Sequence, residues 1–129
     1  MTAPPSRPTR TVLVVDDDPS IRESLNEVLS VEGYRVLQAG DGQEALLALQ
    51  GRNDACVVLL DLAMPRMDGL ALLAELSRLP DPARHPVVVM SANAHPSELE
   101  FPQVVALLRK PFELDELLRW VELCSRASE

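Results

Sequence analysis

Short β-rich runs alternate with segments of helical periodicity along most of the chain. Five such runs are expected to be strands, at residues 11–16, 34–39, 55–60, 86–90 and 104–109. The runs that lead into Asp16 and Asp61 are continuous and apolar, which is typical of strands buried on both faces. Strands that alternate with helices predict an α/β fold, a doubly wound parallel sheet with helices on both faces.

Four helices are expected between and after these strands, at about residues 19–32, 42–50, 70–79 and 114–124. Asp18 can cap the first helix with Pro19 at its first position, and Gly33 is placed to end it. Asp41 is the expected cap of the second helix, in a capping-box spacing with Glu44. The apolar residues of each helix fall on one face: Ile21, Leu25, Val28 and Leu29 in the first, and Leu114, Leu117, Leu118 and Val121 in the last.

Polar residues stand where the apolar strands end. In open parallel sheets, ligands bind at the carboxyl ends of the strands, where the strand order reverses. The residues that fall at this edge are Asp16, Asp17, Asp61, Ser91 and Lys110. Since several strands carry such residues at the same end, a functional site is predicted there.

The three carboxylates predict a metal site. Like charges this close cannot all stay ionised without a counter-charge. Oxygen ligands suit a hard cation such as Mg²⁺. With that charge compensated, Asp61 could attack a phosphoryl group in line. The Lys110 ammonium and the Ser91 hydroxyl could each meet one phosphate oxygen.

Composition narrows the class of protein. The chain has 129 residues, enough for one domain, and residues 1–10 are expected to form a disordered leader. Its net charge of -8 argues against direct nucleic-acid binding, which needs a basic surface. No apolar stretch approaches the roughly 20 residues of a membrane span. The two cysteines have no paired spacing, Cys56 is expected to be buried, and a cytoplasmic location is expected.

Four blocks together resemble the receiver domain of response regulators. They are VLVV followed by Asp16, Asp17 and Asp18; Leu59-Leu60-Asp61 followed by Met64-Pro65 and Met67-Asp68-Gly69; VVVM followed by Ser91-Ala92; and Lys110-Pro111-Phe112. The match covers residues 11–125 and leaves 126–129 as a C-terminal tail. It implies a flavodoxin-like sheet of strand order 2-1-3-4-5 and a cis bond between Lys110 and Pro111.

The resemblance also implies a role for each matching residue. Asp61 would be the phosphoacceptor, Ser91 and Lys110 would sense the phosphate, and Ala63 and Asn93 would tune the lifetime of the phosphorylated state. Mg²⁺ or Mn²⁺ would be bound by Asp16, Asp17, Asp61 and the backbone carbonyl of Ala63.

A phosphoacceptor switch of a two-component or phosphorelay system is the function that the resemblance implies. It would accept its phosphoryl group from a histidine kinase or a phosphotransfer protein. It would catalyse only its own phosphorylation and dephosphorylation. It would signal by protein contacts to an output protein or fused domain, as a monomer or weak dimer without nucleic acid or membrane insertion.

Three departures from the family pattern lie near the end of the chain. Leu107 occupies the switch position that is usually aromatic, and Gln103-Val104 replaces the usual Gly-Ala. The stretch between Ser91 and Lys110 is short and contains two prolines, so the family's fourth helix should be short or irregular, within 97–101, or absent. These changes predict retained phosphochemistry beside an unusual output surface.

Two other readings remain open. A pseudo-receiver would bind a partner without phosphorylation. A haloacid-dehalogenase-like phosphatase would use Asp16-x-Asp18 as its nucleophile motif, although a further acidic motif after the lysine is not evident. His85 and His95 flank prolines and are expected to be surface residues.

Overall fold

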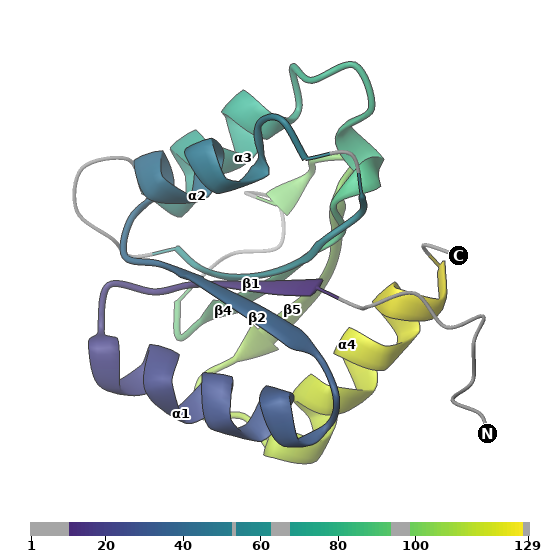
Figure 1. The fold of residues 1–129 in the computed structure, drawn as a ribbon. Helices are drawn as coiled ribbons and strands as arrows, with labels where there is room; N and C mark the ends of the chain where they lie inside the picture. The colour runs from purple at the N-terminus through teal and green to yellow at the C-terminus, as the bar shows by residue number, and fades with distance from the viewer. Residues whose placement is uncertain (1–10, 53, 63–67, 94–98, 128–129) are drawn as a thin grey trace, which may run out of the picture.

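The computed structural model describes residues 11–52, 54–62, 68–93 and 99–127. A five-stranded parallel sheet in the order β2-β1-β3-β4-β5 forms its centre (Figure 1), as predicted. Its strands are β1 (Thr11–Val15), β2 (Arg35–Ala39), β3 (Val57–Asp61), β4 (Val87–Ser91) and β5 (Val104–Arg109). The expected disordered leader, residues 1–10, lies outside the described residues.

Helices cover both faces of the sheet. They are α1 (Pro19–Val31), α2 (Gly42–Leu49), α3 (Gly69–Leu76) and α4 (Leu114–Ala127), with a short 3₁₀ helix η1 (Pro82–Arg84) before β4. Figure 1 shows α2 and α3 on one face of the sheet and α1 and α4 on the other. Among the described residues, no helix is long and apolar enough to cross a membrane.

Side chains of the central strands divide between two cores because successive residues of a strand point to opposite faces. Leu13, Val15, Val58 and Leu60 belong to the core beneath α2 and α3. Val12, Val14, Val57 and Leu59 belong to the core beneath α1 and α4. Burial on both faces explains why these strands are continuous apolar runs in the sequence.

The ends of α1 follow the predicted signals. The side chain of Asp18 accepts a hydrogen bond of 2.9 Å from the amide of Ser20, which caps the helix. Gly33 has a φ of 96°, in the left-handed region that ends helices, and the amide of Tyr34 donates back to the carbonyl of Leu29. This closure turns the chain sharply from α1 into β2.

Two helices differ from the prediction. The third was expected to run to residue 79, but α3 ends at Leu76, where the amides of Arg78 and Leu79 make tighter turn contacts. The last was expected to end near residue 124 and continues to Ala127. Leu114 was expected to point inward and is 42% exposed. It lies in the first turn, at the edge of a buried face centred on later residues of the helix.

The segment between β4 and β5 contains no α-helix in its described residues, 92–93 and 99–103. The rest of the helix expected within 97–101 lies outside the described residues. Gln103 is 1% exposed, and its Nε2 donates a hydrogen bond of 2.9 Å to the carbonyl of Leu73 in α3. The residue that departs from the family pattern therefore joins the start of β5 to α3.

His85 is buried, so its prediction as a surface residue is wrong. It is 5% exposed, and its Nδ1 accepts a hydrogen bond of 3.1 Å from the amide of Cys56. Cys56 is buried as predicted, and burial raises the pKa of its thiol to about 12. The ring provides an acceptor for a backbone amide just before β3 that the sheet does not pair. His95 lies outside the described residues.

Candidate functional site

Three carboxylates meet at the carboxyl edge of the sheet. Asp16 directly follows β1, Asp17 comes next, and Asp61 is the last residue of β3. One carboxylate oxygen from each lies within 4.8 Å of the other two. Asp16 and Asp61 are only 1% and 7% exposed, whereas Asp17 is exposed. The parallel pairing of β1 with β3 brings the two strand ends side by side.

Lys110 is the cation that faces this cluster. Its Nζ lies 3.7 Å from Oδ2 of Asp16 and 3.6 Å from Oδ1 of Asp61. The amide of Lys110 donates a hydrogen bond of 3.0 Å to the carbonyl of Ser91, and the Lys110–Pro111 bond is cis. The main chain therefore holds Lys110 beside the end of β4.

Burial dominates the electrostatics of Asp16. It raises the pKa of this carboxyl above its ordinary value, and the charge of Asp61 adds to the rise. The amide of Asp18, which donates to Oδ1 at 2.9 Å, and the Lys110 charge both oppose it. Oδ2 of Asp16 is buried and accepts no hydrogen bond from the described residues. The ionised cluster thus lacks part of the compensation that a buried carboxylate requires.

A hard cation fits this arrangement. Among the described residues its donors would be carboxylate oxygens, which Mg²⁺ prefers over nitrogen or sulfur, and Asp16 carries a buried oxygen that none of these residues donates to. The Ala63 carbonyl, expected as a further ligand, lies outside the described residues.

Ser91 ends β4 beside the cluster. β3 and β4 pair so that Asp61 is opposite Met90, one residue before Ser91. The Ser91 Oγ accepts a hydrogen bond of 3.2 Å from the amide of Asn93, which is exposed. Leu107 is half-buried and packs against the core beneath α2 and α3. Its aliphatic side chain therefore lies on that face of the sheet.

Arg22 contacts the site although the sequence reading missed it. Its Nη1 donates a hydrogen bond of 2.6 Å to the backbone carbonyl of Asp16, whose amide donates to the carbonyl of Ala39 at 3.1 Å. The signal was available in the sequence, because Arg22 stands one helical turn after the cap Asp18 and so returns toward the end of β1.

Gly69 lets α3 begin against the backbone at the end of β3. A Cβ at this position would lie 2.6 Å from Cα of Leu62 and 3.0 Å from the carbonyl oxygen of Asp61. Asp68 caps the helix, accepting a hydrogen bond of 2.8 Å from the amide of Ala71.

The fold and the acidic edge define a class, a doubly wound α/β domain with three carboxylates and a lysine at the switch point. The response regulator receiver domain matches residues 12–122 of the sequence. The chain belongs to this family, the receiver domains of two-component signalling.

Relatives and solved structures agree with this assignment. The chain is 44% identical over 115 residues to the response regulator MprA of Mycolicibacterium vanbaalenii, covering 83% of this chain and 46% of the relative. It is 40% identical over 126 residues to MprA of Mycobacterium leprae, covering 92% and 52%. The chain thus spans about half the length of these relatives.

Among solved structures, the receiver domain of the Francisella response regulator 1452 superposes with a TM-score of 0.82 at 30% identity, covering 94% of this chain and all of that one. The Vibrio cholerae chemotaxis protein CheY4 gives 0.79 at 29% identity, covering 91% and 99%. TrrA of Thermotoga maritima, solved with Mg²⁺ and BeF, gives 0.76 at 34% identity, covering 90% and 99%.

Proposed function

We propose that the chain is a phosphoacceptor switch in which Asp61 receives a phosphoryl group from a histidine kinase or a phosphotransfer protein. The observation that carries the proposal is the position of Lys110, whose Nζ lies within 3.7 Å of the buried carboxylates of Asp16 and Asp61. A lone surface lysine would not approach two buried acids at the carboxyl edge of a parallel sheet.

Asp16, Asp17 and Asp61 would hold Mg²⁺, or Mn²⁺, with the backbone carbonyl of Ala63 as a further ligand. The bound cation supplies positive charge that lets an anionic phosphoryl group approach the acids. TrrA, which is 34% identical to this chain, was solved with Mg²⁺ and BeF, and this supports the proposed cofactor.

Asp61 acts as the nucleophile. One carboxylate oxygen attacks phosphorus as the bond to the donor's phosphohistidine nitrogen breaks, and the released imidazole takes up a proton. Lys110 then compensates the charge of one phosphoryl oxygen, and the Ser91 hydroxyl donates to another. The product is an acyl phosphate, which water can hydrolyse at the same site, with Ala63 and Asn93 setting access.

The signal would leave the domain through protein contacts rather than through direct binding of nucleic acid. The relatives are about twice as long as this chain, which supports an output domain or partner in their signalling. Leu107 places a half-buried aliphatic group where the family pattern has an aromatic ring. We therefore infer an output surface of unusual composition, in a monomer or weak dimer within the cytoplasm.

Intact-mass measurement after incubation with acetyl phosphate and Mg²⁺ tests the proposal. Wild type should gain one phosphoryl group, and Asp61→Asn should gain none. Asp115→Asn serves as the matched control, because Asp115 is an exposed acid on α4 that does not belong to the cluster of three carboxylates. Peptide mapping should then place the group on Asp61.

The other outcomes identify the alternatives. Modification of Asp61→Asn to the extent of wild type would contradict the assignment. An unmodified wild type, also refractory to candidate kinases, would indicate a pseudo-receiver. Modification at Asp16 would indicate phosphatase chemistry of the haloacid-dehalogenase type.

A further inference from the structure

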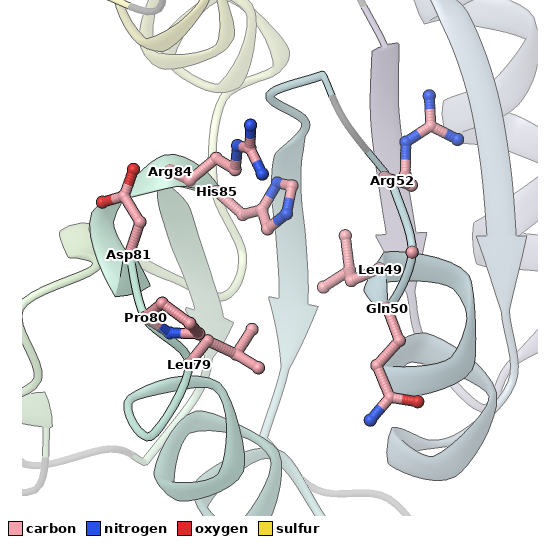
Figure 2. A pocket seen from close by; sticks show the side chains of 9 residues that line it. Leu49, Gln50, Arg52, Leu79, Pro80, Asp81, Arg84 and His85 are labelled. Atoms are coloured by element: carbon pink, nitrogen blue, oxygen red, sulfur yellow. The ribbon is translucent and has the colours of Figure 1, made fainter.

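A cavity of about 240 Å³ lies at the edge of the sheet opposite the acidic cluster. It opens between the segment that follows α2 and the segment that joins α3 to β4 (Figure 2). β3 and β4 begin beside it, whereas Asp61 and Ser91 stand at the other ends of these strands. The proposed phosphorylation chemistry does not use this cavity.

His85 supplies a polar group to the cavity. Its ring is buried, and Nδ1 accepts a hydrogen bond from the amide of Cys56. The neutral ring therefore carries its proton on Nε2. Burial and the charge of Arg84 lower the pKa of His85, which keeps the ring neutral at pH 7. Within the described part of the chain, the only hydrogen bond of His85 is the one to Cys56. Figure 2 shows the ring directed from its backbone toward the side of the cavity formed by Leu49.

Arg84 stands next to His85 and adds a positive charge. Figure 2 shows its guanidinium beside the His85 ring and extending toward the same space, while the carboxylate of Asp81 points away from the ring. A guanidinium has five N–H donors in a planar fork, so it can serve several acceptors at once. The two side chains thus present donors to one region of the cavity.

The remaining lining is mixed: it includes the polar residues Gln50, Arg52 and Asp81, and three side chains supply its apolar part. Leu49 and Leu79 face each other across the cavity, and Pro80 lies next to Leu79 (Figure 2). Leu49 belongs to the core beneath α2 and α3, so this wall is fixed by the fold. Apolar walls with a few convergent polar groups are the usual character of small-molecule sites.

We propose that this cavity binds a small organic carboxylate with an apolar body. Its carboxylate would accept hydrogen bonds from Nε2 of His85 and from the guanidinium of Arg84, and its apolar part would contact Leu49, Leu79 and Pro80. A neutral donor beside a cation favours an anionic acceptor over a neutral ligand. The volume equals roughly eight water molecules at about 30 Å³ each, which suits a molecule of the size of benzoate.

Benzoate titration followed by amide chemical shifts tests the proposal, with benzyl alcohol as the neutral probe of similar shape. Benzoate should shift the amides of residues 49–52 and 79–85 in a saturable manner. Benzyl alcohol should bind about tenfold more weakly, because hydrogen bonds to charged groups are stronger than neutral ones. Sodium chloride at matched ionic strength controls for non-specific anion effects.

His85→Asn is the matched variant. Its Oδ1 can take the place of Nδ1 and accept the Cys56 amide, whereas the Nε2 donor is lost. We expect a folded protein, checked by its thermal unfolding, that binds benzoate about tenfold more weakly. Arg84→Gln should weaken the binding of benzoate more than the binding of benzyl alcohol.

Each of the following results would overturn the proposal: no saturable response to benzoate, shifts reproduced by chloride, equal affinity for the two probes, or unchanged affinity for benzoate in folded His85→Asn. Shifts confined to Lys110 and the acidic cluster would also do so, since they would place the anion at the other edge.

Discussion

The guanidinium of Arg22 donates a hydrogen bond of 2.6 Å to the backbone carbonyl oxygen of Asp16. That carbonyl belongs to the peptide that joins Asp16 to Asp17, so the bond fixes the peptide from which both acids project. The amide of Asp16 is held on the other side by Ala39 of β2. Arg22 would therefore orient the proposed metal ligands through this peptide.

Arg22→Met should weaken Mg²⁺ binding about tenfold, because residues that orient metal ligands typically contribute 10- to 100-fold in affinity. Isothermal titration calorimetry measures the effect directly. Arg35→Met, at an exposed arginine that begins β2, should bind Mg²⁺ as wild type does. Arg22→Lys should recover part of the loss. Equal Mg²⁺ affinity in wild type and Arg22→Met would contradict a positioning role.

Asp16→Asn should raise the free energy of unfolding of the metal-free protein at pH 7, while abolishing stabilisation by Mg²⁺. The folded-state pKa of Asp16 is raised above 3.8, mainly by burial, so its contribution to stability is present at low pH and is lost as pH rises through the folded-state pKa. Urea unfolding of both proteins with chelator, from pH 3.5 upward, should show a gap that grows with pH.

Asp18→Asn provides a control in which the pH dependence of stability has the opposite sign. The hydroxyl and amide of Ser20 lower the pKa of Asp18, so its contribution is present above 3.8 and is lost as pH falls. The free energy of unfolding of wild type should therefore rise relative to that of Asp18→Asn as pH rises. A pH-independent difference between wild type and Asp16→Asn would exclude the burial argument.

Gly69→Ala should destabilise the protein by about 1–3 kcal/mol, the usual cost of overpacking, and slow phosphorylation of Asp61. The added Cβ would press on Leu62 and on the carbonyl of Asp61. Gly51→Ala is the control: Gly51 has a φ of 82° and no atom near the added Cβ, so it should cost about 1–2 kcal/mol through backbone strain alone. Its phosphorylation rate should match wild type. Equal rates in both variants would contradict a contact with the acceptor strand.

Gln103→Met should change the free energy of unfolding by less than about 1 kcal/mol, although it removes a buried hydrogen bond. The carbonyl of Leu73 keeps its bond from the amide of Ser77, and the substitution also removes Oε1, which is buried without a partner among the described residues. Gln103→Glu should cost at least about 2 kcal/mol at pH 7, because its carboxylate would face that carbonyl. Chemical denaturation distinguishes these outcomes. A large loss of unfolding free energy in Gln103→Met would show that the hydrogen bond from Nε2 outweighs the cost of burying Oε1.

The sequence predicted the sheet because its strands are buried on both faces. Burial on both sides demands an uninterrupted apolar run, so the polar residue that follows marks the strand end. Asp16 and Asp61 stood out for this reason, and the parallel topology then placed them at one edge. The ends of α1 were equally predictable from the sequence, because Asp18 and Gly33 act through local backbone contacts.

Residues that act through distant partners were not predictable in this way. His85 was taken for a surface residue because its acceptor role depends on Cys56, which lies 29 residues earlier in the chain, just before β3. Gln103 was recognised as unusual, but its bond to Leu73 requires α3 to pack beside β5. Leu114 fits the helical period of its neighbours and is exposed because it lies at the edge of the buried face. In each case the position of the side chain depends on how segments that are distant in the sequence pack together.

The proposed site is distributed over strands that are remote along the chain. Asp16 and Lys110 follow β1 and β5, and Asp61 is the last residue of β3. These residues become neighbours only when their strands have joined the sheet. A partly folded form in which these strands are not paired therefore lacks the cluster. Mg²⁺ should draw the population toward the native state and leave local fluctuations of isolated segments unaffected. Metal affinity should therefore report the pairing of β1 with β3, whereas a substitution that stops β5 from docking should remove Lys110 from the site, however far it lies from Asp61.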